Sequence, residues 1–373
     1  MKASIVLAAI VAMAGLTGCI SGEKNFMYVT GRGTNEVFGF QLQRDGSIKA
    51  LGTPNFATGS QPASLAVHQP GDFIYIANSA GNNLTQLNIN RSNGELTVPT
   101  TNSAIPPVVP PNIFGTGVTP VSVAVSPTGP FVYALNQGSG NISAFLLDPS
   151  TGVLSLITNP PGNPPGASPS YGAFTAPSAM AISPKGTALF VVSPTQGVMS
   201  MPIDNSKGQL GAQSTPVAAG TSPSSITVEG TGQFAYVTDP ATNSVFAFAI
   251  GTNGALSPVA GSPFQAGAGP VASTIDATGN FLYVANQSDN TVSGFLIKPD
   301  GTLSPVPGSP FTSSGRGPGF VAASANFVYI ADQTTNDISV LSIGKNGALT
   351  PVAGSPFSIA VSPQWITLQA QAQ

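Results

Sequence analysis

The chain contains very few of the residues from which most catalytic and metal sites are built. Its 373 residues include one cysteine, one histidine and one tryptophan. A single histidine excludes a multi-histidine metal centre, and the lone Cys19 can form no internal disulfide and argues against structural zinc. No phosphate-binding glycine motif links a strand to a helix, so the sequence predicts neither a metal site nor a cofactor. Asp45, Asp289 and Asp300 are interpreted as turn residues, which leaves a Ca²⁺ site open.

Charge is equally scarce. Only 7% of the residues are charged, the formal net charge is −3, and no basic run occurs. Nucleic acid is therefore not an expected partner. The chain has instead 43 glycines, 35 prolines and a hydrophobic fraction of 41%. So many turn formers with so much apolar material predict an all-β protein rather than a disordered one.

The N-terminus has the pattern of an export signal. One lysine, an apolar run and small residues lead to Leu16–Cys19 (LTGC), which resembles the bacterial lipobox. We therefore expect residues 1–18 to be a signal peptide, Cys19 to be lipidated, and residues 19–25 to tether the body to a membrane. Ile20 stands where an aspartate would favour the inner membrane, so the outer membrane or the cell surface is expected. The alternative is a plain secretory signal with an accidental cysteine.

A repeat occupies the rest of the chain. The stretch FLYVANQSDNTVSGFLIKPDGTLSPVPGSPF, residues 281–311, returns in drifted copies that open at Phe26, Phe73, Phe131, Leu189, Phe234 and Phe327. Successive copies open 45 to 58 residues apart, and each contains short apolar strands separated by polar turns. Four short strands in each of seven copies predict a seven-bladed β-propeller over residues 26–373.

The inner strands predict how the ring closes. The pattern P-x-x-x-A-V precedes six copies, but the first copy lacks it. A seventh version, residues 363–368, stands near the C-terminus with no copy after it. We expect this strand to complete the N-terminal blade, which closes the ring and removes its free edges.

Some recurrent residues have a structural interpretation. Six of the seven tyrosines occupy the third position of the FxYV strand, which indicates packing between blades. Asparagines end the next turn because they tolerate left-handed backbone. His68 ends an inner strand where other copies have serine or an acidic residue, so we interpret it as a turn-capping residue. Two proline-rich insertions, residues 99–119 and 158–176, either form part of a binding face or are rigid decoration.

One cluster is a candidate ligand-binding site. Ring closure would bring Arg32 and Arg316 to the same end of the ring. Phe320 and Trp365 occupy the third position of neighbouring inner strands, where other copies have serine or alanine. Arginine beside aromatic rings suits a carboxylate, a phosphate or a sugar. The alternative is that Trp365 plugs the central channel and both arginines are solvated.

The repeat resembles the lactonase-type seven-bladed propellers, the family of bacterial 6-phosphogluconolactonase and fungal carboxy-cis,cis-muconate cyclase. The resemblance covers residues 26–373 and rests on the FxYVAN strand, the G-x-L-x-P-V turn and the P-x-x-x-A-V-S-P-x-G connection. It implies a substrate site at the channel mouth, with His, Arg and Glu near the starts of the inner strands. Here those strands open GTSPSSITV, GAGPVASTI and GRGPGFVAA, and only Arg316 fits that pattern. The mostly non-enzymatic YVTN-type surface-layer propellers have a similar pattern.

Two functions are compatible with these residues. An exported lipoprotein lactonase would hydrolyse a sugar lactone, with Arg316 and Arg32 holding the acidic end or the developing oxyanion. A non-catalytic surface or periplasmic scaffold would use the same end of the ring to bind a glycan or a protein. No acid–base pair is recognisable, which leaves the catalytic residues unknown and favours the scaffold. In both cases we expect a monomer held at the membrane by its lipid.

Overall fold

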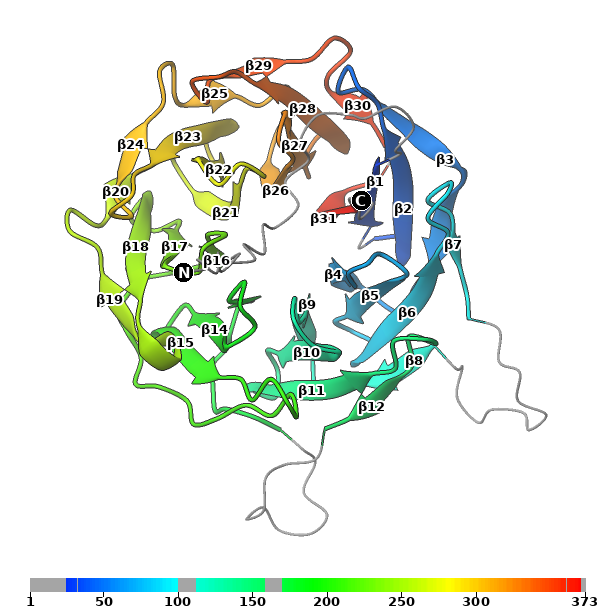
Figure 1. The fold of residues 1–373 in the computed structure, drawn as a ribbon. Helices are drawn as coiled ribbons and strands as arrows, with labels where there is room; N and C mark the ends of the chain where they lie inside the picture. The colour runs from blue at the N-terminus through cyan, green and yellow to red at the C-terminus, as the bar shows by residue number, and fades with distance from the viewer. Residues whose placement is uncertain (1–24, 32, 100–111, 158–169, 360, 370–373) are drawn as a thin grey trace, which may run out of the picture.

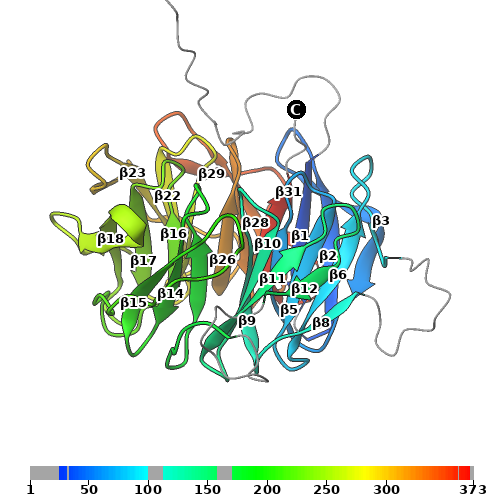
Figure 2. The ribbon, with the colours of Figure 1, turned by 60° about the horizontal axis from the view of Figure 1, so that its bottom comes forward.

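The computed structural model describes residues 25–31, 33–99, 112–157, 170–359 and 361–369. Seven antiparallel sheets stand around one axis (Figure 1), which confirms the predicted seven-bladed propeller. From the side, the strands run between the two faces of the ring (Figure 2). The one helical element of this part is the short 3-10 turn η1, Thr252–Gly254. No helix among these residues is long and apolar enough to cross a membrane.

The blades are numbered along the chain, and their strands are given from the axis outward. Blade 1 contains β31 (Pro363–Gln369), β1 (Asn25–Gly31), β2 (Glu36–Leu42) and β3 (Ile48–Ala57). Blade 2 contains β4 (Pro62–Val67), β5 (Phe73–Asn78), β6 (Asn83–Ile89) and β7 (Leu96–Thr97), with β8 (Ile113–Gly115) also paired to β6. Blade 3 contains β9 (Pro120–Val125), β10 (Phe131–Asn136), β11 (Asn141–Leu147) and β12 (Leu154–Leu156). Blade 4 contains β13 (Ala179–Ile182), β14 (Ala188–Ser193) and β15 (Gly197–Pro202).

The last three blades each add a short strand that pairs with the third strand. Blade 5 contains β16 (Ser225–Val228), β17 (Phe234–Asp239), β18 (Ser244–Ile250), β19 (Leu256–Pro258) and β20 (Phe264–Gln265). Blade 6 contains β21 (Pro270–Ile275), β22 (Phe281–Asn286), β23 (Thr291–Ile297), β24 (Leu303–Pro305) and β25 (Phe311–Thr312). Blade 7 contains β26 (Pro318–Ala323), β27 (Phe327–Asp332), β28 (Asp337–Ile343), β29 (Leu349–Pro351) and β30 (Phe357–Ser358).

The C-terminal strand closes the ring, as the sequence predicts. Strand β31 pairs antiparallel with β1, in a register that runs from Phe26 opposite Gln369 to Gly31 opposite Pro363. Ile366 in β31 is buried in the cluster formed with blade 7. The first and last strands of the described chain therefore share one sheet, and β1 is paired on both of its edges.

The second strand of each blade is buried on both faces because each blade packs between two others. In β5 (FIYIAN) and β10 (FVYALN), for example, every residue is buried. Five of the recurrent tyrosines use this strand to reach the next blade, where the phenol donates a hydrogen bond to the carbonyl of a turn glycine. The donors and acceptors are Tyr28 and Gly94, Tyr75 and Gly152, Tyr133 and Gly208, Tyr236 and Gly301, and Tyr283 and Gly347. The interpretation of these tyrosines as inter-blade contacts is thus confirmed.

Other recurrent residues also lie as expected. The turn asparagines adopt left-handed backbone, with φ between 50° and 58° at Asn35, Asn82, Asn243, Asn290 and Asn336. The ends of the two proline-rich insertions belong to blades. Strand β8 pairs with β6, and Tyr171 forms a bridge to Ile142 in blade 3. Residues 100–111 and 158–169 of these insertions lie outside the described residues.

The two faces of the ring differ in what they carry. Five inner strands begin with proline, and each of these prolines pairs with the last residue of the second strand. We call this end the proline face; its strands begin at Pro62, Pro120, Pro270, Pro318 and Pro363. The inner strands end at the opposite face, near His68 in blade 2 and Gln369 in blade 1.

Candidate functional site

The two large aromatic residues of the inner strands lie in contact near the proline face. Phe320 in β26 and Trp365 in β31 have ring centroids 4.2 Å apart, with an angle of 30° between the ring planes. Both side chains are only partly buried. Neighbouring inner strands bring them together because ring closure sets β31 beside β26. We call these two residues the aromatic pair.

Amide side chains lie on the same face, in the loops beside the aromatic pair. Gln287 Nε2 donates a hydrogen bond to Gln333 Oε1 over 3.3 Å, which links blades 6 and 7. Gln333 lies over the start of β26, since a Cβ on Gly319 would come within 2.2 Å of its side chain. The Gln333 carbonyl accepts a bond from Ser362 Oγ, which in turn accepts one from Gln364. The aromatic pair is therefore bordered by neutral donors and acceptors.

Arg316 provides a positive charge near the aromatic pair. It lies in the loop that leads into β26, four residues before Phe320, and its side chain is exposed. Its backbone N–H donates to Thr335 Oγ1 over 2.9 Å, and its carbonyl accepts from Thr334. The loop is therefore fixed, and the exposed guanidinium makes no hydrogen bond or ion pair with the described residues. Arg32, which the sequence groups with it, lies outside the described residues.

Two carboxyl groups that the sequence analysis did not single out meet below this loop. Asp332 ends β27, Asp337 begins β28, and the two residues lie directly opposite each other in the sheet. Asp332 is fully buried, and its carboxyl group adjoins that of Asp337: a Cβ on Gly315 would come within 2.3 Å of an Asp337 carboxyl oxygen and 2.5 Å of an Asp332 one. Burial raises the pKa of Asp332 to about 6, against hydrogen bonds from Ser339 and Ser313 that lower it. Asp337 is also buried, and this raises its pKa as well.

The repeat itself contains the signal for this pair. The second strand ends in asparagine in FIYIAN, FVYALN and FLYVAN, but in aspartate in FVYIAD. The opposite residue, five positions later, is Asn83, Asn141 and Thr291 in those three copies and Asp337 in this one. Comparison of the copies column by column therefore identifies blade 7 as the blade with two facing carboxyl groups.

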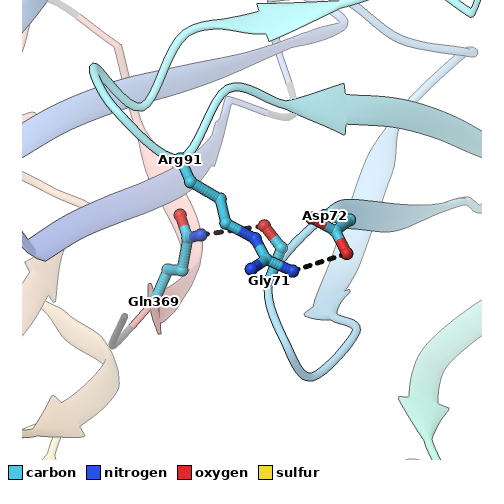
Figure 3. Close-up of polar contacts among 4 residues, drawn as sticks. All are labelled: Gly71, Asp72, Arg91 and Gln369. Carbon is cyan, nitrogen blue, oxygen red and sulfur yellow. Dashed lines mark hydrogen bonds and ion pairs between the residues drawn. The ribbon is translucent and has the colours of Figure 1, made fainter. Parts of the chain in front are cut away.

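The single histidine lies at the opposite face of the ring, where the inner strands end, and is therefore far from this site. His68 stacks on Phe73 with ring centroids 5.8 Å apart, and its Nδ1 has no hydrogen-bond partner among the described residues. Burial lowers its pKa, and Arg91 adds to this effect while Asp72 opposes it. Asp72 and Arg91 themselves form an exposed ion pair of 2.6 Å (Figure 3). His68 is thus a packing residue at the turn.

The equivalent positions in other blades cap the turn as expected. Ser183 Oγ accepts the amides of Thr187 and Ala188, and Glu229 accepts those of Thr231, Gln233 and Phe234. His68 differs from them because its free ring nitrogen receives no such bond from the described chain.

The acidic turn residues do not assemble into a metal site. In the part of the chain that the structure describes, no three His, Cys, Asp or Glu side chains gather as metal ligands. Asp45 and Asp300 instead accept hydrogen bonds from the residues two positions later, as expected of turn aspartates. Asp289 accepts the backbone N–H of Ala268 from the neighbouring loop.

Fold and site together define a closed seven-bladed propeller with aromatic, amide and arginine side chains at one end of its axis. The chain matches the family model described as "Lactonase, 7-bladed beta-propeller" over residues 19–110, 166–273, 188–319 and 263–361. These matches cover more than half of the sequence. The protein therefore belongs to the lactonase family of seven-bladed β-propellers.

Known relatives agree with this family. A 6-phosphogluconolactonase from Bacillus subtilis is 27% identical over 135 residues, which are 36% of this chain and 37% of the relative's length. A candidate 6-phosphogluconolactonase from Bacteroides uniformis has a similar structure, with a TM-score of 0.73, 19% identity, and coverage of 93% of this chain and 99% of that one. A periplasmic gluconolactonase from Pseudomonas aeruginosa gives a TM-score of 0.71, 20% identity, and coverage of 94% and 99%. At these identities the two structures bear on the fold alone.

Proposed function

We propose that the proline face around the aromatic pair binds a sugar lactone and promotes its hydrolysis to the sugar acid. The observation that carries this proposal is the stack of Phe320 on Trp365, at positions where other blades have small residues. Partly exposed aromatic faces with a few polar groups at their border are typical of ligand sites. Membership of the lactonase family supports the choice of a lactone.

The residues present suit the charges of this reaction. Water adds to the lactone carbonyl carbon, the bond from that carbon to the ring oxygen breaks, and the ring oxygen leaves as a hydroxyl after gaining a proton. Negative charge develops on the carbonyl oxygen, where the exposed guanidinium of Arg316 would donate hydrogen bonds. The product is a carboxylate, which arginine also binds well. The amides of Gln333 and Gln364 offer partners for sugar hydroxyls.

A second function, glycan binding without catalysis, is favoured by one observation. The carboxyl groups of Asp332 and Asp337 are buried and bonded to neighbours, and His68 lies at the opposite face. Neither carboxyl group of this pair nor the histidine is thus an exposed general base beside the aromatic pair. A scaffold that binds a sugar or glycan here needs only the aromatic, amide and arginine groups.

Acid release from lactones separates these two functions. Purified protein would be mixed with D-glucono-1,5-lactone and with 6-phospho-D-glucono-1,5-lactone, and proton release compared with the uncatalysed rate. Hydrolysis that Trp365→Ala and Arg316→Ala both remove supports the lactonase. Arg44→Ala, which removes an exposed arginine in the turn between β2 and β3, serves as the matched control. Binding without any acceleration supports the scaffold.

We also propose that the protein is exported and anchored by lipid at Cys19. The support is the apolar run that ends in LTGC. These residues lie outside the described part of the chain. Mass spectrometry of the mature N-terminus should find a diacylglyceryl cysteine. A cleaved, unmodified N-terminus on protein released to the medium would contradict the proposal.

A further inference from the structure

Blade 7 departs from a hydrogen-bond arrangement that three other blades share. In blades 2, 3 and 6, a buried asparagine ends the second strand and donates both Nδ2 hydrogens, one to the residue five positions later and one to the residue seven positions later. The bonds run from Asn78 to Asn83 and Thr85, from Asn136 to Asn141 and Ser143, and from Asn286 to Thr291 and Ser293. In blade 7 these three positions are Asp332, Asp337 and Ser339.

In blade 7, a carboxyl group replaces the asparagine amide, and a second carboxyl group replaces its acceptor. The bond between these two positions then has no donor unless one carboxyl group carries a proton. Ser339 and Ser313 both donate their hydroxyls to Asp332, which reverses the direction of the bond found in the other blades. Asp337 already accepts a hydrogen bond from Thr335 Oγ1 over 3.0 Å. Because the two carboxyl groups adjoin, a hydrogen bond between them needs a proton on one of them. Two ionised carboxylates at this distance and burial would repel each other.

An aspartate at the same position in blade 5 shows how the protein holds a charged group there. Asp239 accepts hydrogen bonds from the backbone amides of Thr221, Ser222 and Ala241 and from Thr242 Oγ1. The residue opposite is Ser244, so no second carboxyl faces it. Asp332 is bonded by the hydroxyls of Ser313 and Ser339, and it faces another acid. Sequence alone makes the two aspartates look alike, but their surroundings differ.

The charged and titratable groups around the pair are few. Strands β26, β29, β30 and β31 carry no ionisable side chain, and β27 adds only Tyr329. Asp289 lies in the loop after β22 and is bonded to Ala268, while Lys345 follows β28 at the opposite face. Arg316, in the loop before β26, is the remaining charged residue described at the proline face of blades 6 and 7, and Glu36 begins β2 in the adjoining blade 1. Its backbone N–H donates to Thr335 Oγ1, and the same hydroxyl donates to Asp337.

We propose that Asp332 and Asp337 hold one proton between them and act, through Thr335, as positioning residues for the loop that carries Arg316. Loss of that proton sets two negative charges against each other, and the separation of Asp337 releases Thr335 from the Arg316 amide. The Arg316 loop is then ordered at acidic pH and looser at alkaline pH. The pair gives the proline face a pH dependence that the other blades lack.

Carboxyl NMR tests the shared proton directly. In protein labelled with ¹³C at the aspartate side chains, Asp332 and Asp337 should titrate together, with one step well above the ordinary aspartate range. Asp332→Asn should restore the arrangement of blades 2 and 3, and the midpoint of Asp337 should then fall. Two independent titrations in the ordinary acidic range would overturn the proposal.

Amide hydrogen exchange tests the connection to Arg316. After correction for the intrinsic pH dependence, protection of the Arg316 amide should fall as the pair loses its proton, and Asp332→Asn should abolish this fall. The matched control is Asp239→Asn, which places an amide donor against at least one backbone donor in either orientation and should destabilise the protein at every pH. An Arg316 amide whose protection is unchanged across the titration would overturn the positioning role.

Neither measurement needs a ligand, so the result is separate from that of the lactone assays. The inference rests on the proposed function only in one respect, namely that Arg316 meets the ligand. If D-glucono-1,5-lactone binds, its affinity should weaken as pH rises through the titration of the pair, and Asp332→Asn should remove that dependence. If the lactone does not bind, the NMR and exchange results still decide on the shared proton.

Discussion

The side-chain amide of Gln369 donates a hydrogen bond to the carbonyl of Gly71 over 2.9 Å, although 298 residues separate them (Figure 3). The same side chain accepts a bond from Tyr28 in β1, and Tyr28 also donates to Gly94 in blade 2. The last strand is therefore fixed both to its own blade and to the next one. Closure of the ring rests on hydrogen bonds as well as on apolar packing.

Deletion of residues 361–373 should open the ring. The truncated protein loses β31, which exposes the edge of β1 and removes the buried Ile366 and the packed Trp365. Burial of each large apolar side chain contributes about 1.5–3 kcal/mol, so these two side chains alone contribute about 3–6 kcal/mol, which reaches the lower end of a typical net stability of about 5–15 kcal/mol. We expect aggregation or a much lower melting temperature in differential scanning calorimetry. Melting like that of the full chain would mean that the ring closes in another way.

The inter-blade tyrosine bonds should contribute measurably to stability. Tyr75→Phe removes the 2.7 Å bond to Gly152 and leaves a buried carbonyl without its donor. The expected loss is about 0.5–1.5 kcal/mol in the free energy of unfolding, measured by urea denaturation. Tyr171→Phe is the matched control, because the buried Tyr171 hydroxyl has no partner within the described chain. Equal losses of unfolding free energy in the two variants would show that the hydrogen bond of Tyr75 to the next blade does not stabilise the protein.

His68 should make the protein less stable at acidic pH. Its pKa lies below the ordinary value of 6.5, chiefly because burial disfavours the imidazolium. The unfolded chain then binds the proton more tightly, so stability is lost as pH falls from about 6.5 towards the folded-state pKa. His68→Ser restores the serine found at Ser126, Ser183 and Ser324 and removes this titration.

Melting temperatures at pH 5 and pH 8 measure this effect. The difference in melting temperature between His68→Ser and the parent protein should favour the variant more at pH 5 than at pH 8. Exposed aspartates such as Asp45 and Asp148 have lowered pKa values and also reduce stability in acid, but they do so equally in both proteins. A parent and a variant with identical pH slopes would show that His68 is not the source.

Much of the fold could be predicted from the sequence because the same strand and turn pattern recurs in every copy of the repeat. Strand order, blade number and closure by residues 363–368 all follow from counting copies and from the need to pair every edge. The contact between Phe320 and Trp365 followed in the same way, since both occupy equivalent positions of adjacent inner strands. The tyrosines were placed between blades by recurrence, while their glycine acceptors depended on turn geometry that recurrence does not reveal.

The site was less predictable because it depends on exceptions to the repeat. Asp332 and Asp337 each look like an ordinary polar turn residue when one copy is taken alone, and comparison of the copies identifies them as a pair only once the residues that face each other in β27 and β28 are known. His68 occupies a capping position without capping the turn, because an imidazole stacked on Phe73 cannot do what a serine hydroxyl does there. Gln333 gains its place over β26 from Gly319, a neighbour only in the folded chain.

Fluorescence of the single tryptophan offers the most direct test of the proline face as the ligand site. Trp365 lies in the aromatic pair and is the one tryptophan of the chain, so its emission reports on this place alone. Titration with D-glucono-1,5-lactone or with D-gluconate should give a saturable change. Arg316→Ala should weaken the affinity about 10- to 100-fold, as expected for loss of a charge-assisted hydrogen bond, and Arg44→Ala should not. Emission that stays constant while the ligand binds or is hydrolysed, or an affinity that ignores Arg316, would contradict the account.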